Sequence, residues 1–178
     1  MNFAPWEKAT RCTSGPEPGM RALADFLLTA YPLGWSGGIF NCRTVRGSAQ
    51  PSMHGEGRAF DLMLPVVAGK GHPQGHYIVK RLGAVGRDMG VQCVIFDRTI
   101  WSARSPNGRP YTGVHPHYDH LHIELTRGAA RRLTAAEVER FLTPKNEWEP
   151  VVVQEPVRPV VPDVRDGWRR HLARLRVR

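Results

Sequence analysis

The chain has few cysteines, few acidic residues and no long apolar segment, and each shortage excludes a class of protein. Only three cysteines occur among its 178 residues, without a C-x-x-C pair, so a four-cysteine zinc site is excluded. No stretch approaches the roughly 18 consecutive apolar residues of a membrane-spanning helix. Residues 1–12 lack the apolar run of roughly 7 to 15 residues found in a secretory signal. We therefore expect no transmembrane segment and no Sec-type export.

Acidic residues are outnumbered, with 16 Asp and Glu against 25 Lys and Arg, and the formal charge is +9. A polyanion or an anionic surface is the natural partner of such a chain. Charge alone does not distinguish nucleic acid, an anionic bacterial cell wall and a membrane surface. With 41% hydrophobic residues, the chain is long enough for one compact domain and an appendage, but not for two full-sized domains.

Hydrophobic spacing predicts an α+β domain. Apolar residues recur with helical spacing over residues 19–31 and 75–89, and Thr134 with Glu137 forms the capping-box pattern that starts a third helix. Residues 103–118, dense in Pro, Gly, His and Arg, are expected to form a loop. We predict a small antiparallel sheet with helices packed on one face. Its strands are expected near residues 39–40 and over residues 91–96, 99–102 and 121–125.

The composition changes near the C-terminal end. Residues 150–164 contain four prolines and only valine as an apolar type, which is typical of an extended linker. The following segment has six arginines against one acid, a local charge of +5. We therefore divide the chain into a domain over residues 1–144, a Pro/Val-rich linker over 145–164 and a basic amphipathic segment over 165–178, which would dock on an anionic wall or membrane.

Two of the cysteines lie in loop sequence. Cys12 and Cys42 would form a disulfide if the protein works outside the cytoplasm, and the sequence leaves this open. Cys93 lies in a β-branched apolar run and is expected to be buried and inert.

Histidine is concentrated in one short segment. Four of the eight histidines lie between residues 115 and 122, in the sequence HPHYDHLH. In a strand, His120 and His122 project from the same face. Burying two adjacent imidazoles without a partner is costly, and a divalent cation is a common partner of neutral imidazole. For an isolated H-x-H pattern, the alternative is a pair of solvated loop histidines.

A second element completes a candidate metal site. The pattern S-x-H-x-x-G-x-A-x-D places His54 and Asp61 seven residues apart around a glycine turn. Together with one strand histidine they supply two imidazoles and one carboxylate, and a fourth tetrahedral position stays open to water. An open position is typical of a catalytic zinc site rather than a structural one. The cofactor we expect is therefore Zn²⁺.

These two elements resemble those of a known group of enzymes. The S-x-H-x-x-G-x-A-x-D element followed by D-H-x-H is similar to the LAS group of zinc peptidases, which joins lysostaphin-type, D-Ala-D-Ala carboxypeptidase-type and hedgehog-type domains. The resemblance covers roughly residues 10–143 and is greatest to the D-alanyl-D-alanine carboxypeptidase and peptidoglycan endopeptidase branch. It implies a hedgehog-like or D-Ala-D-Ala peptidase-like fold whose sheet carries the zinc site.

The resemblance also implies ligands and a substrate contact. His54, Asp61 and His122 match the positions of the three zinc ligands. Members of the group place a basic residue upstream of the first motif, where it binds a substrate carbonyl or carboxylate. Arg43 and Arg46 are the candidates, and Arg43 is preferred. An arginine can hold a carboxylate through two parallel hydrogen bonds, which would orient a peptide stem.

Catalytic roles are implied for residues just before the last ligand. Asp119 stands where many members of the group keep an acidic general base. His120 and His117 stand where other branches keep histidines that stabilise the transition state. A carboxylate can remove a proton from zinc-bound water, and an imidazole can donate to a developing oxyanion. Whether Asp119 or His120 is the general base stays open.

We therefore expect a monomeric zinc peptidase that hydrolyses an amide bond in bacterial peptidoglycan and does not bind nucleic acid. Without an export signal, the expected setting is a phage endolysin that leaves the host cytoplasm through a holin pore, with an injected effector or leaderless bacterial enzyme as the other setting. Endopeptidase and carboxypeptidase activity, and hence the bond cleaved, are not distinguished.

Two other classes of function compete with this one. The basic charge and the Asp119-His120 pair are compatible with a metal-dependent nuclease of the His-Asn-His type, although that leaves the His54 to Asp61 element unexplained. A hedgehog-type module would keep the zinc without catalysis, and the acid at position 119 argues against it.

Overall fold

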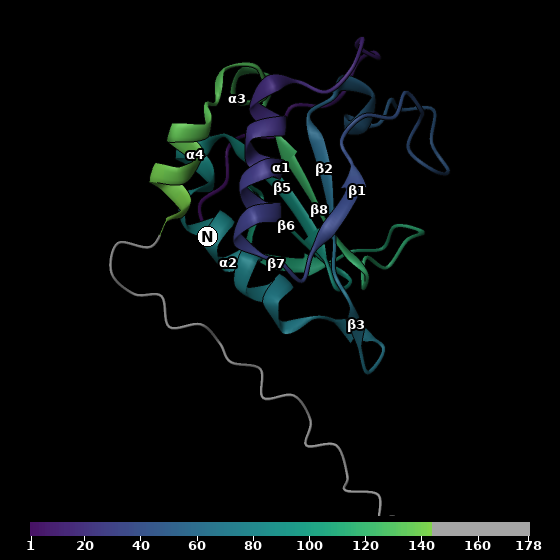
Figure 1. Ribbon diagram of the computed structural model, residues 1–178. Coiled ribbons are helices and arrows are strands. Elements are labelled where there is room, and N and C mark those ends of the chain that lie inside the picture. The colour runs from purple at the N-terminus through teal and green to yellow at the C-terminus, as the bar shows by residue number, and fades with distance from the viewer. Residues whose placement is uncertain (144–178) are drawn as a thin grey trace, which may run out of the picture. The chain divides into compact units, whose positions relative to one another are not determined.

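A six-stranded antiparallel sheet forms the centre of the fold in a computed structural model that describes residues 1–143 (Figure 1). The strand order across the sheet is β1-β2-β8-β5-β6-β7. Because β8 pairs with both β2 and β5, a late part of the chain is inserted between two earlier strands. The strands are β1 (Trp35–Gly38), β2 (Ala59–Met63), β5 (Val91–Phe96), β6 (Thr99–Ser102), β7 (Ser105–Pro110) and β8 (His120–Leu125).

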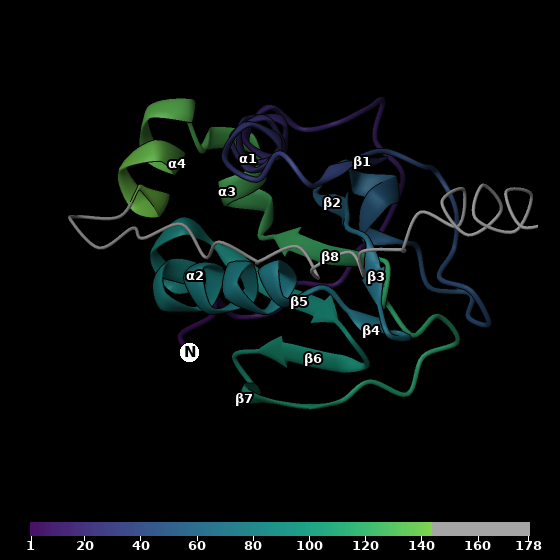
Figure 2. The ribbon, with the colours of Figure 1, turned by 60° about the horizontal axis from the view of Figure 1, so that its bottom comes forward.

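Helices cover one face of this sheet, as Figure 2 shows. The first helix contacts β2 and the second contacts β5, and two short helices near the end of the described chain pack against them. A 3-10 helix, η1, precedes β2, and a separate two-stranded hairpin follows it. These elements are α1 (Pro18–Ala30), η1 (Met53–Glu56), β3 (Val66–Val67), β4 (Lys70–Gly71), α2 (Pro73–Met89), α3 (Arg127–Arg132) and α4 (Ala135–Leu142).

The alternation of residues in β8 separates a core face from a polar face. Leu121 and Ile123 are fully buried in the core between the sheet and the helices. His120, His122 and Glu124 alternate with them, so their side chains project from the opposite face of the sheet. The core thus holds β8 in a register that presents three polar side chains away from the helices.

The helix predictions are confirmed, with small changes at the ends. The helix expected over residues 19–31 is α1, and that expected over residues 75–89 is α2, which starts two residues earlier and ends at Gly90 in the left-handed conformation. Thr134 and Glu137 form the capping box that starts α4. The α+β class with an antiparallel sheet is confirmed at this level, and the hedgehog-like form of the fold stays a prediction.

Two predictions at the sheet edges are wrong for the same reason. The strand expected near residues 39–40 is β1, which ends just before them, and residues 103–118, expected to form a loop, contain β7. Both are edge strands rich in Gly or Pro, which become strands through pairing with one neighbour rather than through their own propensity. At Gly37, a Cβ would lie 2.7 Å from Met63 Sδ and 3.0 Å from Asp61 Cβ, so the close approach of β1 to β2 requires glycine.

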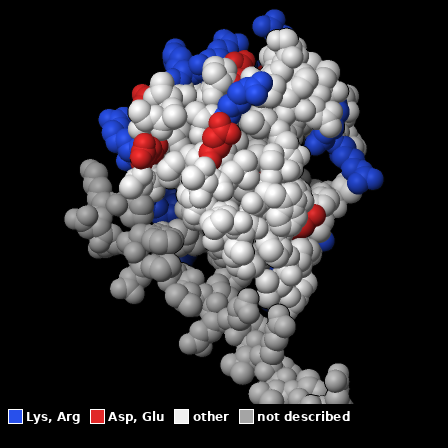
Figure 3. Space-filling model, in the orientation of Figure 1, with Lys and Arg blue, Asp and Glu red and all other residues white. Residues whose placement is uncertain are grey.

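Basic side chains are spread over the domain. Within residues 1–143, 17 Lys and Arg residues exceed 11 Asp and Glu residues. On the helix-covered side drawn in Figure 3, the Lys and Arg side chains lie mainly at the periphery and the middle is largely uncharged. Among the described residues, no helix is long and apolar enough to cross a membrane. The predicted linker over 145–164 and the basic segment over 165–178 lie outside the described residues.

Cys12 and Cys42 form a disulfide, the pairing that the sequence left open. The bond joins the N-terminal segment to the loop that precedes η1. Cys12 Sγ lies 3.3 Å from where a Cβ at Gly55 would be, and the backbone N–H of Asn41 donates to the carbonyl of His54 at 3.2 Å. Both halves of the disulfide therefore lie against the short helix that carries a predicted zinc ligand.

Replacing Cys12 and Cys42 together with serine is expected to lower the free energy of unfolding by about 3 kcal/mol, because the bond links residues 30 apart in the sequence. Chemical denaturation with and without reductant checks this: reductant should lower the midpoint of the wild-type chain and leave that of the double variant unchanged. Cys93 is free and buried, and burial raises the pKa of its thiol, so it does not compete for pairing. An unchanged wild-type midpoint after verified reduction would contradict the prediction.

Candidate metal centre

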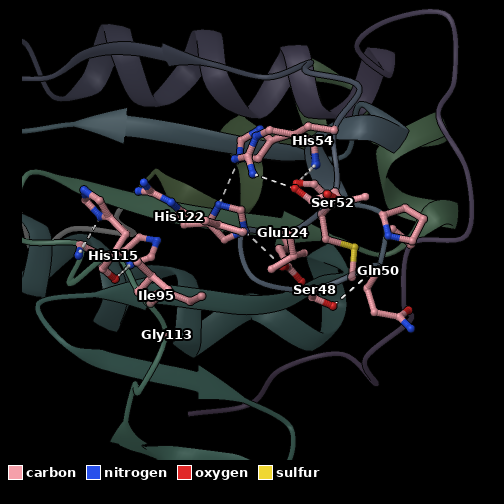
Figure 4. Close-up of a pocket in the computed structure, with 18 of the residues that line it drawn as sticks. Ser48, Gln50, Ser52, His54, Ile95, Gly113, His115, His122 and Glu124 are labelled. Atoms are coloured by element: carbon pink, nitrogen blue, oxygen red, sulfur yellow. Dashed lines mark hydrogen bonds and ion pairs between the residues drawn. The ribbon is translucent and has the colours of Figure 1, made fainter.

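His54, Asp61 and His122, the three predicted zinc ligands, converge on the polar face of the sheet. Figure 4 shows His54 and His122 turned toward one another. Asp61 pairs with His122 across β2 and β8, and His54 lies in η1. His54 Nε2 lies 3.2 Å from His122 Nδ1 and 3.3 Å from Asp61 Oδ2, and His122 Nδ1 lies 2.9 Å from Asp61 Oδ1. Tetrahedral zinc with bonds of about 2.0–2.1 Å separates its donors by about 3.3 Å, so these atoms fit one ion.

The remaining nitrogen of each ligand imidazole is held by a hydrogen bond. His54 Nδ1 donates to the carbonyl of Ile39 at 2.9 Å, so Nε2 of the neutral ring carries the lone pair. His122 Nε2 donates to Glu124 Oε1 at 3.1 Å, which leaves Nδ1 for the metal. Such bonds fix the tautomer and the orientation of metal-binding histidines. Ser52 acts on the backbone instead, because its Oγ accepts from the N–H of His54 at 3.3 Å and caps η1.

Opposite charges within the site shift its titration. Burial opposes the charge of Asp61, but hydrogen bonds to His122 and His54 outweigh it and hold the pKa of this carboxyl well below its usual range. Burial likewise opposes a charge on His122, while hydrogen bonds to Asp61 and Glu124 raise the pKa of its ring to about 10. Because a metal ligand must give up its proton, metal binding at this site should release one.

A buried polar chain, missed in the sequence, leads from Glu124 to Arg58. Glu124 Oε2 accepts from Gln92 Nε2 at 2.8 Å and from Trp6 Nε1 at 3.3 Å, and Gln92 Oε1 accepts from Arg58 Nη1 at 3.2 Å. Arg58 is only 1% exposed. Burial opposes the charge of Glu124, but hydrogen bonds from His122 and Gln92 lower the pKa of its carboxyl. Glu124 is thus a buried hydrogen-bond partner of the predicted metal ligand His122.

Two features explain why this chain was missed. The pairing of β5 with β8 shifts between Val91 and Cys93, so Gln92 is the extra residue of a β-bulge. Simple alternation would have turned Gln92 toward the helices with the core residues of β5. Arg58 stands two residues before Phe60, on the core-facing alternation of β2, and a charged residue at such a position is the one signal that could have revealed it.

His120 and Asp119 form a pair beside the three ligands. His120 Nδ1 donates to Asp119 Oδ1 at 2.8 Å, and its Nε2 lies 3.8 Å from Asp61 Oδ1. The side chain of Asp119 is 43% exposed, against 13% for His120. Burial lowers the pKa of His120, although the charges of Asp61 and Asp119 oppose this. The neutral ring therefore has its Nε2 lone pair on the side of the ligands.

His117 lies next to this pair and is buried. Its Nδ1 donates to the carbonyl of His115 at 2.7 Å, so the neutral ring carries a lone pair on Nε2. Burial, together with the charges of His120 and His122, lowers the pKa of His117 to about 3. In this form Nε2 is an acceptor, so donation to an oxyanion, the role predicted for His117, would require a second proton on the ring.

The ligands line a pocket with a volume of about 900 Å³. Arg43 and Arg46, the two candidate substrate-binding arginines, line the same pocket, as do Trp6 and Val114. Arg43 Nη1 donates to its neighbour's carbonyl at 3.4 Å, and within residues 1–143 neither arginine forms an ion pair. All of the predicted site residues except Asp119 line this pocket, and Asp119 is hydrogen-bonded to His120, which does. Two guanidinium groups are therefore available to an anionic ligand in the pocket.

Comparison with known families matches residues 12–122 to the family described as VldE, C-terminal domain. The chain belongs to the VldE C-terminal domain family. The matched segment begins at the first disulfide cysteine, Cys12, and ends at the last ligand, His122, so the complete three-residue centre lies within this VldE-type domain. No curated protein and no solved structure matches the chain. The match names a domain family without a reaction, so the resemblance to LAS peptidases stays a prediction.

Replacing Glu124 with glutamine in this VldE-type domain is expected to weaken zinc binding by at least about 10-fold, because the neutral amide makes His122 a less basic ligand. The substitution preserves the shape of the buried side chain. Competition with a chromophoric chelator measures the affinity, and the exposed Glu139→Gln variant is the matched control. Equal affinities for Glu124→Gln and Glu139→Gln would contradict the prediction.

Proposed function

We propose that the domain is a zinc-dependent peptidase that hydrolyses an amide bond in bacterial peptidoglycan. The observation that carries this proposal is the convergence of His54, Asp61 and His122, whose donor atoms lie 2.9–3.3 Å apart inside a pocket. Two imidazoles and one carboxylate are a ligand set of catalytic zinc, with one position left for water. A structural zinc site would supply four protein ligands instead.

A zinc ion held by these residues would lower the pKa of a bound water toward about 7 and polarise the scissile carbonyl. His120 Nε2 would take the proton of that water, because it carries a lone pair and lies 3.8 Å from a ligand oxygen. The same ring would then pass the proton to the leaving amine. His120 is therefore the general base and acid of the proposed reaction.

Asp119 has the role of a positioning residue in this mechanism. Its carboxylate accepts from His120 Nδ1 at 2.8 Å, which fixes the ring tautomer and stabilises the imidazolium that forms after proton transfer. Within residues 1–143, Asp119 forms no hydrogen bond or ion pair with His54, Asp61 or His122, and its side chain is more exposed than that of His120. The proposal thus gives His120 the role of general base and Asp119 the role of its positioning residue, a choice that the sequence left open.

The proposed substrate fits the charge of the pocket. Peptide stems of peptidoglycan carry free carboxylates, and Arg43 or Arg46 could hold one through two parallel hydrogen bonds. The absence of ion pairs at both arginines, within the described residues, leaves their charge available to such a group. A monomeric phage endolysin is the setting we propose for this activity, with peptidoglycan as its partner.

Incubation of the zinc-loaded protein with purified peptidoglycan tests the proposal, and a parallel incubation with plasmid DNA tests the nuclease alternative. Mass spectrometry of the released muropeptides should find one new amino group and one new carboxyl group for each bond cleaved, and the products identify the bond. A metal chelator should stop the reaction, and added zinc should restore it. Cleavage of DNA with intact wall would favour the nuclease alternative, and a zinc-loaded protein that cleaves neither would favour a binding module.

A further inference from the structure

We propose that His115, His117 and His120 form a second site for a divalent transition-metal cation, beside the three-residue centre described above. One ring nitrogen from each of these histidines lies within 4.8 Å of the other two. The ring centroids are 5.1 Å apart for His115 and His117, 5.1 Å for His115 and His120, and 4.6 Å for His117 and His120. Three imidazoles with one open position are a ligand set that zinc uses in proteins.

Two of the three donors are already in a tautomer that binds metal. His117 Nδ1 donates to the carbonyl of His115 at 2.7 Å, and His120 Nδ1 donates to Asp119 at 2.8 Å. Each ring therefore carries its lone pair on Nε2. Within residues 1–143, neither Nε2 atom has a hydrogen-bond partner, and both residues line the pocket. A hydrogen bond from the distal nitrogen to a carbonyl or carboxylate is the usual support of a metal-binding histidine.

His115 is the adaptable member of the group. Its Nδ1 accepts the backbone N–H of His117 at 3.1 Å, so the ring must turn or shift its proton to bind a cation through Nε2. Its side chain is 49% exposed, which leaves room for that movement. We therefore expect the second site to bind more weakly than the preformed first one.

The backbone conformation at His117 supports the proposed second cation site. His117 has a φ of 56°, a left-handed conformation that is uncommon outside glycine and is enriched at functional sites. Its carbonyl accepts the N–H of Asp97 at 2.7 Å, and its own N–H binds the His115 ring. Hydrogen bonds on both sides thus hold the residue in this conformation, with its ring beside His120.

Occupation of the second site would engage the Nε2 lone pairs of His117 and His120. If His120 is the general base, as the proposed function holds, a second ion blocks proton transfer and excess zinc inhibits hydrolysis. Only this consequence rests on the proposed peptidase activity. Binding of the ion itself is measured without any substrate.

Zinc titration of the full chain against a chromophoric chelator tests the site. We expect two ions per chain, the second bound at least about 10-fold more weakly than the first. His115→Ala should keep the first ion and lose the second, since it removes one imidazole and leaves the carbonyl that supports His117. His76→Ala is the matched control, because its side chain is 45% exposed and pairs with Asp97 outside both groups. His76→Ala should keep both ions.

A single ion at saturating zinc would overturn the second site. The second site would also be overturned if His115→Ala still bound two ions, or if the second ion were lost in a His171→Ala variant instead. The rate of peptidoglycan hydrolysis tests the expected inhibition independently. Excess zinc should lower this rate for the wild-type protein and for His76→Ala but not for His115→Ala. If no protein in the series hydrolyses wall, the proposed function fails, while two ions per wild-type chain and one in His115→Ala still establish the site.

Discussion

Replacing His122 with alanine is expected to abolish stoichiometric zinc binding and to reduce peptidoglycan hydrolysis by at least about a thousandfold. His122 supplies one of three donors, and its Nδ1 lies 2.9 Å from Asp61 and 3.2 Å from His54. Two protein ligands do not hold a catalytic zinc ion, and the polarisation that the ion supplies is worth several kcal/mol in the transition state. At about 1.4 kcal/mol per tenfold change in rate, a loss of several kcal/mol of transition-state stabilisation corresponds to a rate at least about a thousandfold lower.

The fold must be separated from the metal in this experiment, because His122→Ala also leaves the buried Glu124 without its imidazole partner. His54→Ala removes a ligand from η1 rather than from the central strand and should cause the same loss of zinc and activity. Metal analysis after dialysis, circular dichroism and muropeptide release measure the three properties independently. A folded His122→Ala protein that retains one zinc ion, or one that hydrolyses wall without zinc, would contradict the assignment.

The candidate centre could be predicted from the sequence because its residues sit in short patterns tied to periodic structure. His120 and His122 alternate with buried residues of one strand, and His54 and Asp61 bracket a single turn. Their meeting depends on the insertion of β8 beside β2, which no local pattern specifies. The resemblance to a known group of peptidases provided that link.

The parts that could not be predicted depend on contacts between distant segments. Gln92 reaches Glu124 only because of a bulge in β5, and β7 is a strand only because β6 pairs with it. The proposal of His120 rather than Asp119 as the base depends on the position of each side chain relative to the three predicted ligands, which the sequence does not specify. Tautomers also needed the structure, since the carbonyl that fixes the ring of His117 belongs to another histidine.

Arg58 is the residue whose importance was least visible in the sequence, and it holds four segments together. Its Nε donates to Glu56 at 2.6 Å, and its Nη2 donates to the carbonyl of Glu7 at 2.6 Å. Its Nη1 donates to Gln92 at 3.2 Å and to the carbonyl of Leu125 at 2.8 Å. One guanidinium thus joins the N-terminal segment, the end of η1 and the two central strands β5 and β8. Its contact with Gln92 extends the chain of hydrogen bonds to Glu124 and the metal ligand.

Replacing Arg58 with methionine is expected to lower the free energy of unfolding by about 3–5 kcal/mol. The methionine fills much of the same volume but removes the donors to the Leu125 carbonyl and to Glu56 Oε2, while the Glu7 carbonyl keeps its hydrogen bond from Gln92. Breaking a buried ion pair from one side has a cost of this order. Arg58→Lys should also be destabilising, because an ammonium group cannot reach four acceptors in a planar fork. Denaturation in the presence of a chelator measures the change without a contribution from bound zinc.

The matched control for Arg58→Met is Arg131→Met, whose side chain is 57% exposed and lies 3.7 Å from Glu17. An exposed pair of this kind is worth at most about 1 kcal/mol, so the free energy of unfolding of Arg131→Met should stay close to that of the wild type.

Acid unfolding provides a second measurement of the role of Arg58. Burial raises the pKa of Glu56, but hydrogen bonds from Arg127, Thr10 and Arg58 outweigh it and lower this pKa to about 2. The contribution of Glu56 is therefore complete above its ordinary pKa of 4.5 and is lost as the pH falls toward 2. Arg58→Met should weaken this acid-dependent loss of stability, and a variant with wild-type stability at neutral pH and in acid would show that the buried guanidinium does not support the fold.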